Sequence, residues 1–259
     1  MIHQRIEQLG GAALRFVGAL GELAFFTLKI LRCRVTPPFR FRAFVDEIYK
    51  LGFLSLVIIL VSGMAVGMVL SLQGYNTLAR FGATESLGTV VGLSLIRELG
   101  PVLTALLVTG RAGSATTAEI ATMVATEQLD GLRMMSADPV HVVVVPRATA
   151  MIVVMPMLSA LFILAGLFGG YLIGVELLGV DGGIYVSNME SSIDFHSDVL
   201  GSLLKAFVFG ILLALYATYR GFVSAPNSAG VSAATTSTVV VSSVSILICD
   251  YVITALWGV

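Results

Sequence analysis

The feature that most constrains this chain is a run of 22 residues, 51–72, that contains no charged side chain. At about 1.5 Å of rise per residue, such a helix measures about 33 Å, which is enough to cross the hydrocarbon core of a bilayer. Further apolar stretches follow at 87–110, 142–175, 199–219 and 238–257. The chain is 12% charged, about half the share in a soluble domain. The sequence therefore predicts an all-α, polytopic membrane protein with five spans.

The first 50 residues show a different pattern, in which apolar or small residues recur every three to four positions. This stripe consists of Ile6, Leu9, Ala13, Phe16, Leu20, Leu23, Thr27 and Ile30. It is typical of an amphipathic helix that lies in the membrane interface. Pro37-Pro38 ends the helix, and a second short amphipathic piece follows over 39–50, for which packing on a cytosolic partner is the alternative. We expect an interfacial region, 1–50, and a transmembrane domain, 51–259.

The distribution of Lys and Arg predicts the orientation. Eight basic residues precede the first span, whereas the predicted outer loops contain only Arg80. Basic residues concentrate on the cytoplasmic side of membrane proteins. We therefore expect a cytoplasmic N-terminus, a cytoplasmic segment between the second and third spans, and a C-terminus on the outer side.

Four charged residues fall inside predicted spans: Arg97, Glu98, Lys205 and Asp250. Counted from the outer span boundaries, each lies about six to ten residues deep, or ~9–15 Å at helical rise. A lone charge at such depth costs at least ~2.5–3.5 kcal/mol, and charged residues in spans usually face the bundle interior or a cavity. We expect these four residues to form one layer around a shared cavity.

Two compatible interpretations of this layer remain open. Arg97 and Lys205 could contact the phosphate of a zwitterionic or anionic head group. The charges could instead hold helices in register as ion pairs, Glu98 with Lys205 or Arg97 with Asp250. Gly100-Pro101 follows the first pair and predicts a hinge or an unwound stretch, because proline lacks the N–H that a helix needs.

The segment between the second and third spans carries helix signals. Gly110 to Ala115 indicates a close-packed turn, Thr116 and Glu119 fit a capping box, and Asp138-Pro139 fits the N-cap and first residue of the next span. We expect a cytoplasmic coupling helix over about 116–135 that docks on a nucleotide-hydrolysing subunit, with an ordinary solvated helix as the alternative. Its candidate contact residues are Glu119, Glu127, Asp130 and Arg133.

Catalytic and metal-binding patterns are missing from the sequence. It contains no Gly-xxxx-Gly-Lys-Ser/Thr phosphate loop and no His-Glu-xx-His motif. Cys33 and Cys249 indicate neither a disulfide framework nor a metal site. We therefore predict no catalytic residues, no metal ligands and no cofactor bound by this chain.

Several motifs together resemble the MlaE-type permeases, the membrane subunits of ABC transporters that move phospholipids to maintain outer-membrane lipid asymmetry. The matching stretches are Arg97-Glu-Leu-Gly-Pro-Val, Gly110-Arg-Ala-Gly-Ser, Ala118-Glu-Ile, Ala125-Thr-Glu-Gln-Leu-Asp, Asp138-Pro, Pro146-Arg147, Ser228-Ala-Gly-Val-Ser and Ala234-Thr-Thr. The similarity begins near residue 40 and is densest over 95–150.

The resemblance implies a homodimer in the bacterial inner membrane that is a transport subunit and not an enzyme. ATP and Mg²⁺ would be used by a separate MlaF-like ATPase docked on residues 119–133. A MlaD-like hexameric MCE-domain protein would lie on the periplasmic side, and a MlaB-like STAS-domain protein would bind the ATPase. The lipid would occupy a cavity at the dimer interface, and the family's cavity residues map onto Arg97, Glu98, Leu99 and Lys205.

Two other functions remain as alternatives. Intramembrane carboxylates are found in proton relays, so Glu98 and Asp250 could serve a proton-coupled secondary transporter. The chain shows no internal repeat, which counts against that function. It could also be a structural anchor of a lipid-transfer complex.

Overall fold

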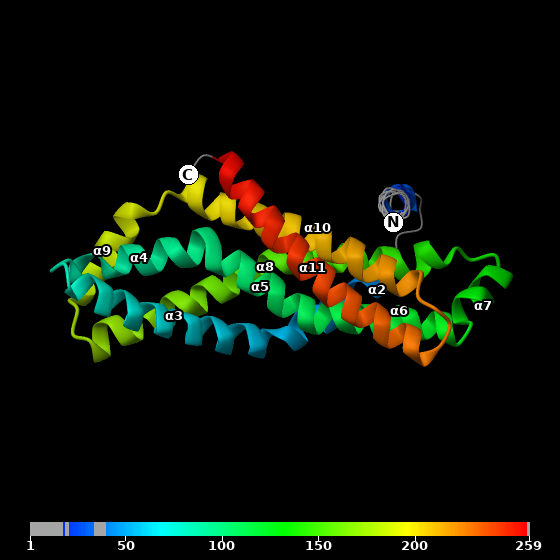
Figure 1. Cartoon of the computed structure of the whole chain (residues 1–259), viewed down its shortest axis with the longest axis horizontal. Helices are drawn as coiled ribbons and strands as arrows, with labels where there is room; N and C mark the ends of the chain where they lie inside the picture. Colours follow the sequence, from blue (N-terminus) through cyan, green and yellow to red (C-terminus); the bar gives the residue numbers. More distant parts are fainter. Residues whose placement is uncertain (1–17, 19–20, 34–39, 258–259) are drawn as a thin grey trace, which may run out of the picture.

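The computed structural model describes residues 18, 21–33 and 40–257, and these are almost entirely helical (Figure 1). Five helical runs are long and apolar enough to cross a membrane: Phe41–Ala79, Thr84–Ala125, Val140–Leu177, Phe195–Phe222 and Ser228–Leu256. They extend along the long axis of the molecule, with α7 (Gln128–Met134) at one end and α9 (Gly182–Ser192) at the other. The prediction of an all-α fold with five spans is confirmed.

Most runs are divided by local changes of helix type. The first run contains α2 (Phe41–Leu51), η1 (Phe53–Ser55) and α3 (Leu56–Ala79); the second contains η2 (Thr84–Ser86), α4 (Leu87–Ser94), η3 (Leu95–Leu99), α5 (Gly100–Val108), η4 (Thr109–Gly113) and α6 (Ser114–Ala125). The third contains η5 (Val140–Val144), α8 (Val145–Tyr171) and η6 (Leu172–Leu177); the fourth contains η7 (Phe195–Val199) and α10 (Leu200–Phe222); the fifth is α11 (Ser228–Trp257). The segments η3 to η7 are π-helical, with wider turns than an α-helix.

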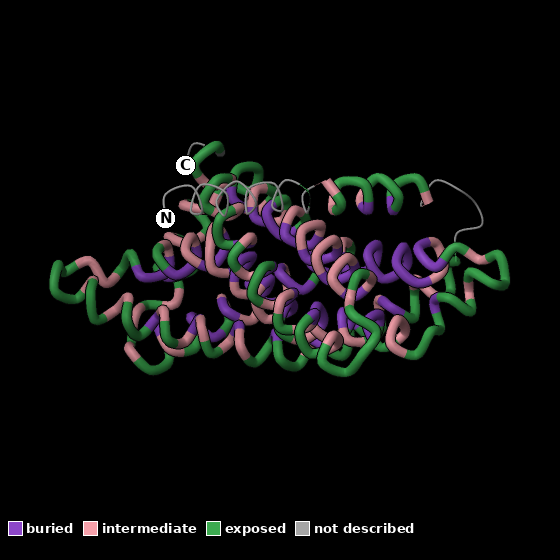
Figure 2. The backbone as a smooth tube through the Cα atoms, turned by 45° about the vertical axis from the view of Figure 1, so that its right-hand side comes forward, coloured by how far each residue is buried: buried purple, intermediate pink, exposed green. Residues whose placement is uncertain are grey.

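The helix α8 is the centre of the bundle, because α2, α3, α5 and α10 all pack on it. A Gly63-xxx-Gly67 pattern forms the contact of α3 with α8: a Cβ atom on Gly67 would clash with the carbonyl oxygen of Gly166. Small residues thus bring the two backbones into direct contact, as is common in membranes. Burial is concentrated along this centre (Figure 2).

The second run does not end where the sequence analysis predicted. The predicted turn around Gly110 is the π-helical η4, and the helix continues through α6 to Ala125. Thr116 is therefore a buried residue inside α6 and not a helix cap. Thr117 Oγ1 lies 3.0 Å from the carbonyl oxygen of Gly113 and 3.0 Å from Thr238 Oγ1 of α11, so this part of α6 is packed inside the bundle.

The predicted single helix over 116–135 is consequently two helices. After α6, Glu127 adopts a left-handed backbone (φ 58°), and α7 begins at Gln128. The prediction for the next span is confirmed: Pro139 is the first helical residue, and Asp138 Oδ1 accepts from the N–H of Val140 at 3.0 Å. The predicted loop before the fifth span is shorter than expected, because α11 already begins at Ser228.

The N-terminal helix is described over 21–33, and the predicted stripe from Ile6 to Phe16 and Leu20 lie outside the described residues. Phe26 and Ile30 are buried against Val140, Val144 and Val145. This helix is seen end-on in Figure 1, beside the α7 end, so it runs across the bundle axis. Its other side exposes Phe25, Leu28 and Leu31, which gives it a second apolar surface.

Candidate functional site

The charged pair Arg97-Glu98 lies on η3, a π-helical segment. Such π-helical turns occur frequently at functional sites. Pro101 follows in the next turn and has no N–H, so it cannot donate to the carbonyl of Arg97 four residues earlier. Lys205 Nζ of α10 donates to this carbonyl at 2.9 Å. A cation on a neighbouring helix thus binds a backbone acceptor to which Pro101 cannot donate.

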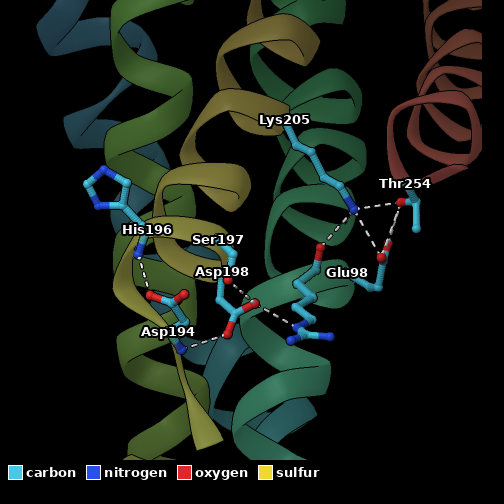
Figure 3. Close-up of polar contacts among 8 residues, drawn as sticks. Glu98, Asp194, His196, Ser197, Asp198, Lys205 and Thr254 are labelled. Atoms are coloured by element: carbon cyan, nitrogen blue, oxygen red, sulfur yellow. Dashed lines mark hydrogen bonds and ion pairs between the residues drawn. The ribbon is translucent and has the colours of Figure 1, made fainter. Parts of the chain in front are cut away.

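Lys205 is the centre of the cluster (Figure 3). Besides the Arg97 carbonyl, its ammonium group donates to Glu98 Oε1 at 3.0 Å and to Thr254 Oγ1 at 2.7 Å, and it lies 3.5 Å from Asp250 Oδ1. An ammonium group has three donors, and three hydrogen bonds satisfy them. The Lys205 side chain is 8% exposed. The ammonium group of Lys205 therefore has no donor left for a ligand.

Arg97 forms a second ion pair, in which its Nε donates to Asp198 Oδ1 at 2.8 Å. Asp198 is buried, and its Oδ2 accepts from the N–H of Asp194 at 2.9 Å. In contrast, the side chains of Arg97 and Glu98 are 35% and 42% exposed. The cluster is thus closed on the sides of Lys205 and Asp198 and open at Arg97 and Glu98.

A small cavity adjoins the open side, and about 20 Å³ of it is accessible to a water molecule. Its lining includes Arg97, Glu98, Asp198, Ser202, Lys205 and Thr254. This is room for about one water molecule and lies far below the volume of ligand sites, about 300–1,000 Å³. Leu99 is half-buried and packs against the hydrophobic core, so it supports η3 from the side.

The structure brings together the four intramembrane charges that the sequence analysis placed in one layer. The predicted pairing of Glu98 with Lys205 is present, but that of Arg97 with Asp250 is wrong. Asp250 lies by Lys205, and Arg97 pairs with Asp198, which the cap of η7 brings inward from the predicted outer loop. Sequence reasoning also missed Thr254. It lies one helical turn after Asp250, and that spacing could have placed both on one face.

The predicted coupling residues occupy two different environments. Glu127, Asp130 and Arg133 lie on the exposed turn into α7 and on α7 itself, where Arg133 Nη1 donates to Asp130 Oδ1 at 2.6 Å. Glu119 is also exposed, but it accepts from Nη2 of the buried Arg147 at 3.1 Å. Sequence reasoning missed the two most exposed apolar residues of this end, Met134 and Met135, which are 82% and 70% exposed.

Comparison with known proteins supports one family across nearly the whole chain. The family described as Permease MlaE matches residues 44–256. The intermembrane phospholipid transport system permease protein MlaE of Haemophilus influenzae is 46% identical over 256 residues, which cover 99% of this chain and 98% of that protein. A probable ABC transporter permease protein of Rickettsia bellii is 39% identical, with 96% of each chain covered. The chloroplastic protein TRIGALACTOSYLDIACYLGLYCEROL 1 of Arabidopsis thaliana is 31% identical over 88% of this chain and 64% of that protein. The chain belongs to the MlaE permease family.

Proposed function

We propose that this chain is the permease subunit of an ATP-driven ABC transporter that moves phospholipids between the bacterial inner membrane and a periplasmic carrier, serving outer-membrane lipid asymmetry. The observation that carries the proposal is the half-open charge cluster beside a cavity within the spans. Charged groups at such depth are rare and generally functional. Its family membership and the printed function of the Haemophilus relative support the same conclusion.

The cluster offers complementary groups to a lipid head group. Arg97 lines the cavity with a third of its side chain exposed, and a guanidinium group can bind a phosphate through two N–H donors. Glu98 is exposed beside it and can accept from the ammonium of a zwitterionic head group. Lys205 and Leu99 contribute by holding η3 in place. Asp250 contributes through its ion pair with Lys205.

The incomplete burial of α11 supports a homodimer. Only 11% of its apolar part is buried, against 44% in the second and fourth runs. Val240, Val244, Leu247 and Tyr251 recur every three to four residues along it, and each is at least half exposed. Since α11 also supplies Thr254 to the cavity, a second copy on this face would enlarge a cavity that is small for a phospholipid.

The α7 end would dock on a separate ATPase subunit, which would bind ATP and Mg²⁺. The exposed methionine pair supports this assignment, because flexible apolar side chains suit a protein groove. This orientation places the N-terminus in the cytoplasm, with the N-terminal helix in the membrane interface, and the C-terminus in the periplasm. The remaining partners are a hexameric MCE-domain protein on the α9 side and a STAS-domain protein on the ATPase.

Photo-crosslinking in cells labelled with radioactive phosphate tests the lipid site. A photoreactive amino acid at Ile253, which lines the cavity, should capture labelled phospholipid. The matched control is Ile58, which is exposed on α3 and remote in sequence from η3, α10 and α11. An adduct at Ile253 that is absent at Ile58 supports the proposal. Equal labelling at Ile58 would show that the adducts arise from general contact with membrane lipid, and it would overturn the proposed lipid site. Transport by this chain alone under a proton gradient would favour the proton-relay alternative.

A further inference from the structure

A second buried charge cluster lies near the α7 end of the bundle. Its centre is Arg147, on α8, with a side chain that is 10% exposed. Arg147 Nε lies 3.5 Å from Glu47 Oε1 of α2, and Arg147 Nη2 donates to Glu119 Oε2 of α6 at 3.1 Å. Its Nη1 donates to the carbonyl of Val143 at 3.1 Å. One guanidinium group therefore joins helices from the first three runs.

A second arginine holds the same part of the molecule. Arg111, on η4, donates from Nη1 to Ser55 Oγ at 2.6 Å and to the carbonyl of Lys50 at 3.3 Å. These acceptors flank the bend at Gly52, where α2 passes through η1 into α3. The inner half of the second run thus holds α2 at two places, directly through Arg111 and through the Arg147 bridge.

Charged contacts between helices restrict helix movement more than apolar contacts do. Apolar helix faces can slide by small steps over one another, as in shear motions. A guanidinium fork has fixed geometry and donates in set directions, so the two hydrogen bonds of Arg147, together with its ion pair to Glu47, resist such sliding. Glu47 and Arg147 are each 10% exposed, whereas Glu119 is 46% exposed. The buried arm joins α2 to α8, and the more accessible arm joins α8 to α6, which leads into α7.

We propose that Arg147 is a positioning residue that makes α2 move together with α6 when the ATPase displaces the α7 end. Displacement of α6 is passed through Arg147 and Arg111 to α2, and from α2 through η1 to α3. The inference rests on the proposed ATPase coupling and identifies the internal route by which that coupling reaches the first span.

A distance measurement tests the route directly. Spin labels on Arg42→Cys of α2 and Thr122→Cys of α6, both exposed positions, are introduced after Cys33 and Cys249 are replaced by serine. In the assembled complex with its ATPase, the label distance should stay narrow and constant with and without ATP. In Arg147→Lys and Glu119→Gln backgrounds it should broaden or change with ATP. The control, Lys29→Gln, breaks an exposed ion pair with Asp138 near the same end and should leave the distance unchanged.

The ratio of phospholipid moved to ATP hydrolysed is a second measurement, and partial unfolding alone would not change it. The amount of phospholipid moved per ATP hydrolysed should fall at least about fivefold in Arg147→Lys, the lower end of typical coupling between sites, with ATPase assembly intact. An unchanged distance distribution together with unchanged coupling would overturn the role of Arg147. If the unsubstituted complex hydrolyses ATP but moves no phospholipid, the proposed function fails, while the distance measurement still tests Arg147.

Discussion

The two charge clusters of this chain have similar chemistry, but only the first exposes a cation: Arg97 is 35% exposed, whereas Arg147 is 10% exposed. In the outer cluster, Lys205 is buried while Glu98 and Arg97 remain 42% and 35% exposed beside a cavity. In the inner cluster, Arg147 and Glu47 are both 10% exposed and the guanidinium group ties three helical runs together. In the inner cluster only the carboxylate of Glu119 is accessible, at 46% exposed, so its buried cation cannot meet an anionic head group. Ligand contact is therefore expected at the outer cluster and mechanical linkage at the inner one.

The largest effect is expected from Lys205→Met. This substitution leaves Glu98, Asp250 and the carbonyl of Arg97 without their shared cation, and breaking a buried ion pair from one side costs about 3–5 kcal/mol. We expect a clearly lower Tm in detergent and loss of lipid transport.

Glu98→Gln should also reduce transport, and the double variant separates the two roles of the pair. Glu98→Gln with Lys205→Met should regain part of the lost Tm, because the unpaired carboxylate is removed, without regaining transport. Recovery of near-normal transport in the double variant would show that the pair is purely structural and that the comparison is mistaken.

A smaller effect is expected from Arg97→Lys, which keeps the charge but loses the planar fork. The Asp198 ion pair can still form, so the Tm should change little, whereas transport and crosslinking at Ile253 should fall roughly tenfold, the loss of about 1.4 kcal/mol of binding.

Arg147→Lys is the matched change in the inner cluster. It should leave crosslinking at Ile253 unchanged, and a parallel loss there would erase the distinction between the clusters.

The sequence predicts some of these features and not others. The five spans follow from hydropathy, and the layer of Arg97, Glu98, Lys205 and Asp250 follows from the cost of charge in a membrane. The pairing within that layer does not, because Asp198 enters it through the cap of η7, a backbone feature without a periodic signal. The capping box at Thr116 is wrong: α6 already begins at Ser114, and Thr116 is buried where α6 packs on α10 and α11.

The inner cluster illustrates the same limit. Arg147 was visible in the sequence as one of several inner-side basic residues, and Glu47 as part of an amphipathic piece. Arg147 and Glu47 are about a hundred positions apart in the sequence, and this spacing does not predict that they form a pair. What joins them is the packing of α2 on α8, which is a property of the whole bundle.

Replacing Glu127 and Arg133 by alanine tests the exposed half of the α7 end. These residues contribute little to the fold, since Arg133 pairs with Asp130 only at the surface. We expect the permease to bind its ATPase about fivefold to tenfold more weakly, roughly 1–1.4 kcal/mol, with unchanged Tm and unchanged crosslinking at Ile253. Full ATPase affinity in this variant would refute the coupling role of the charges and leave Met134 and Met135 as the contact to test.

The smallest effect is expected from Lys29→Gln. Lys29 Nζ lies 3.4 Å from Asp138 Oδ1, and the two side chains are 52% and 40% exposed. Exposed pairs of this kind contribute about 0–1 kcal/mol, so the Tm should shift by no more than a few degrees and the lipid moved per ATP should be unchanged. The variant removes one ion pair near the same end as Arg147→Lys does. If it lowered coupling as strongly, burial would not distinguish the inner cluster from a surface ion pair, and the mechanical role assigned to Arg147 would lose its physical basis.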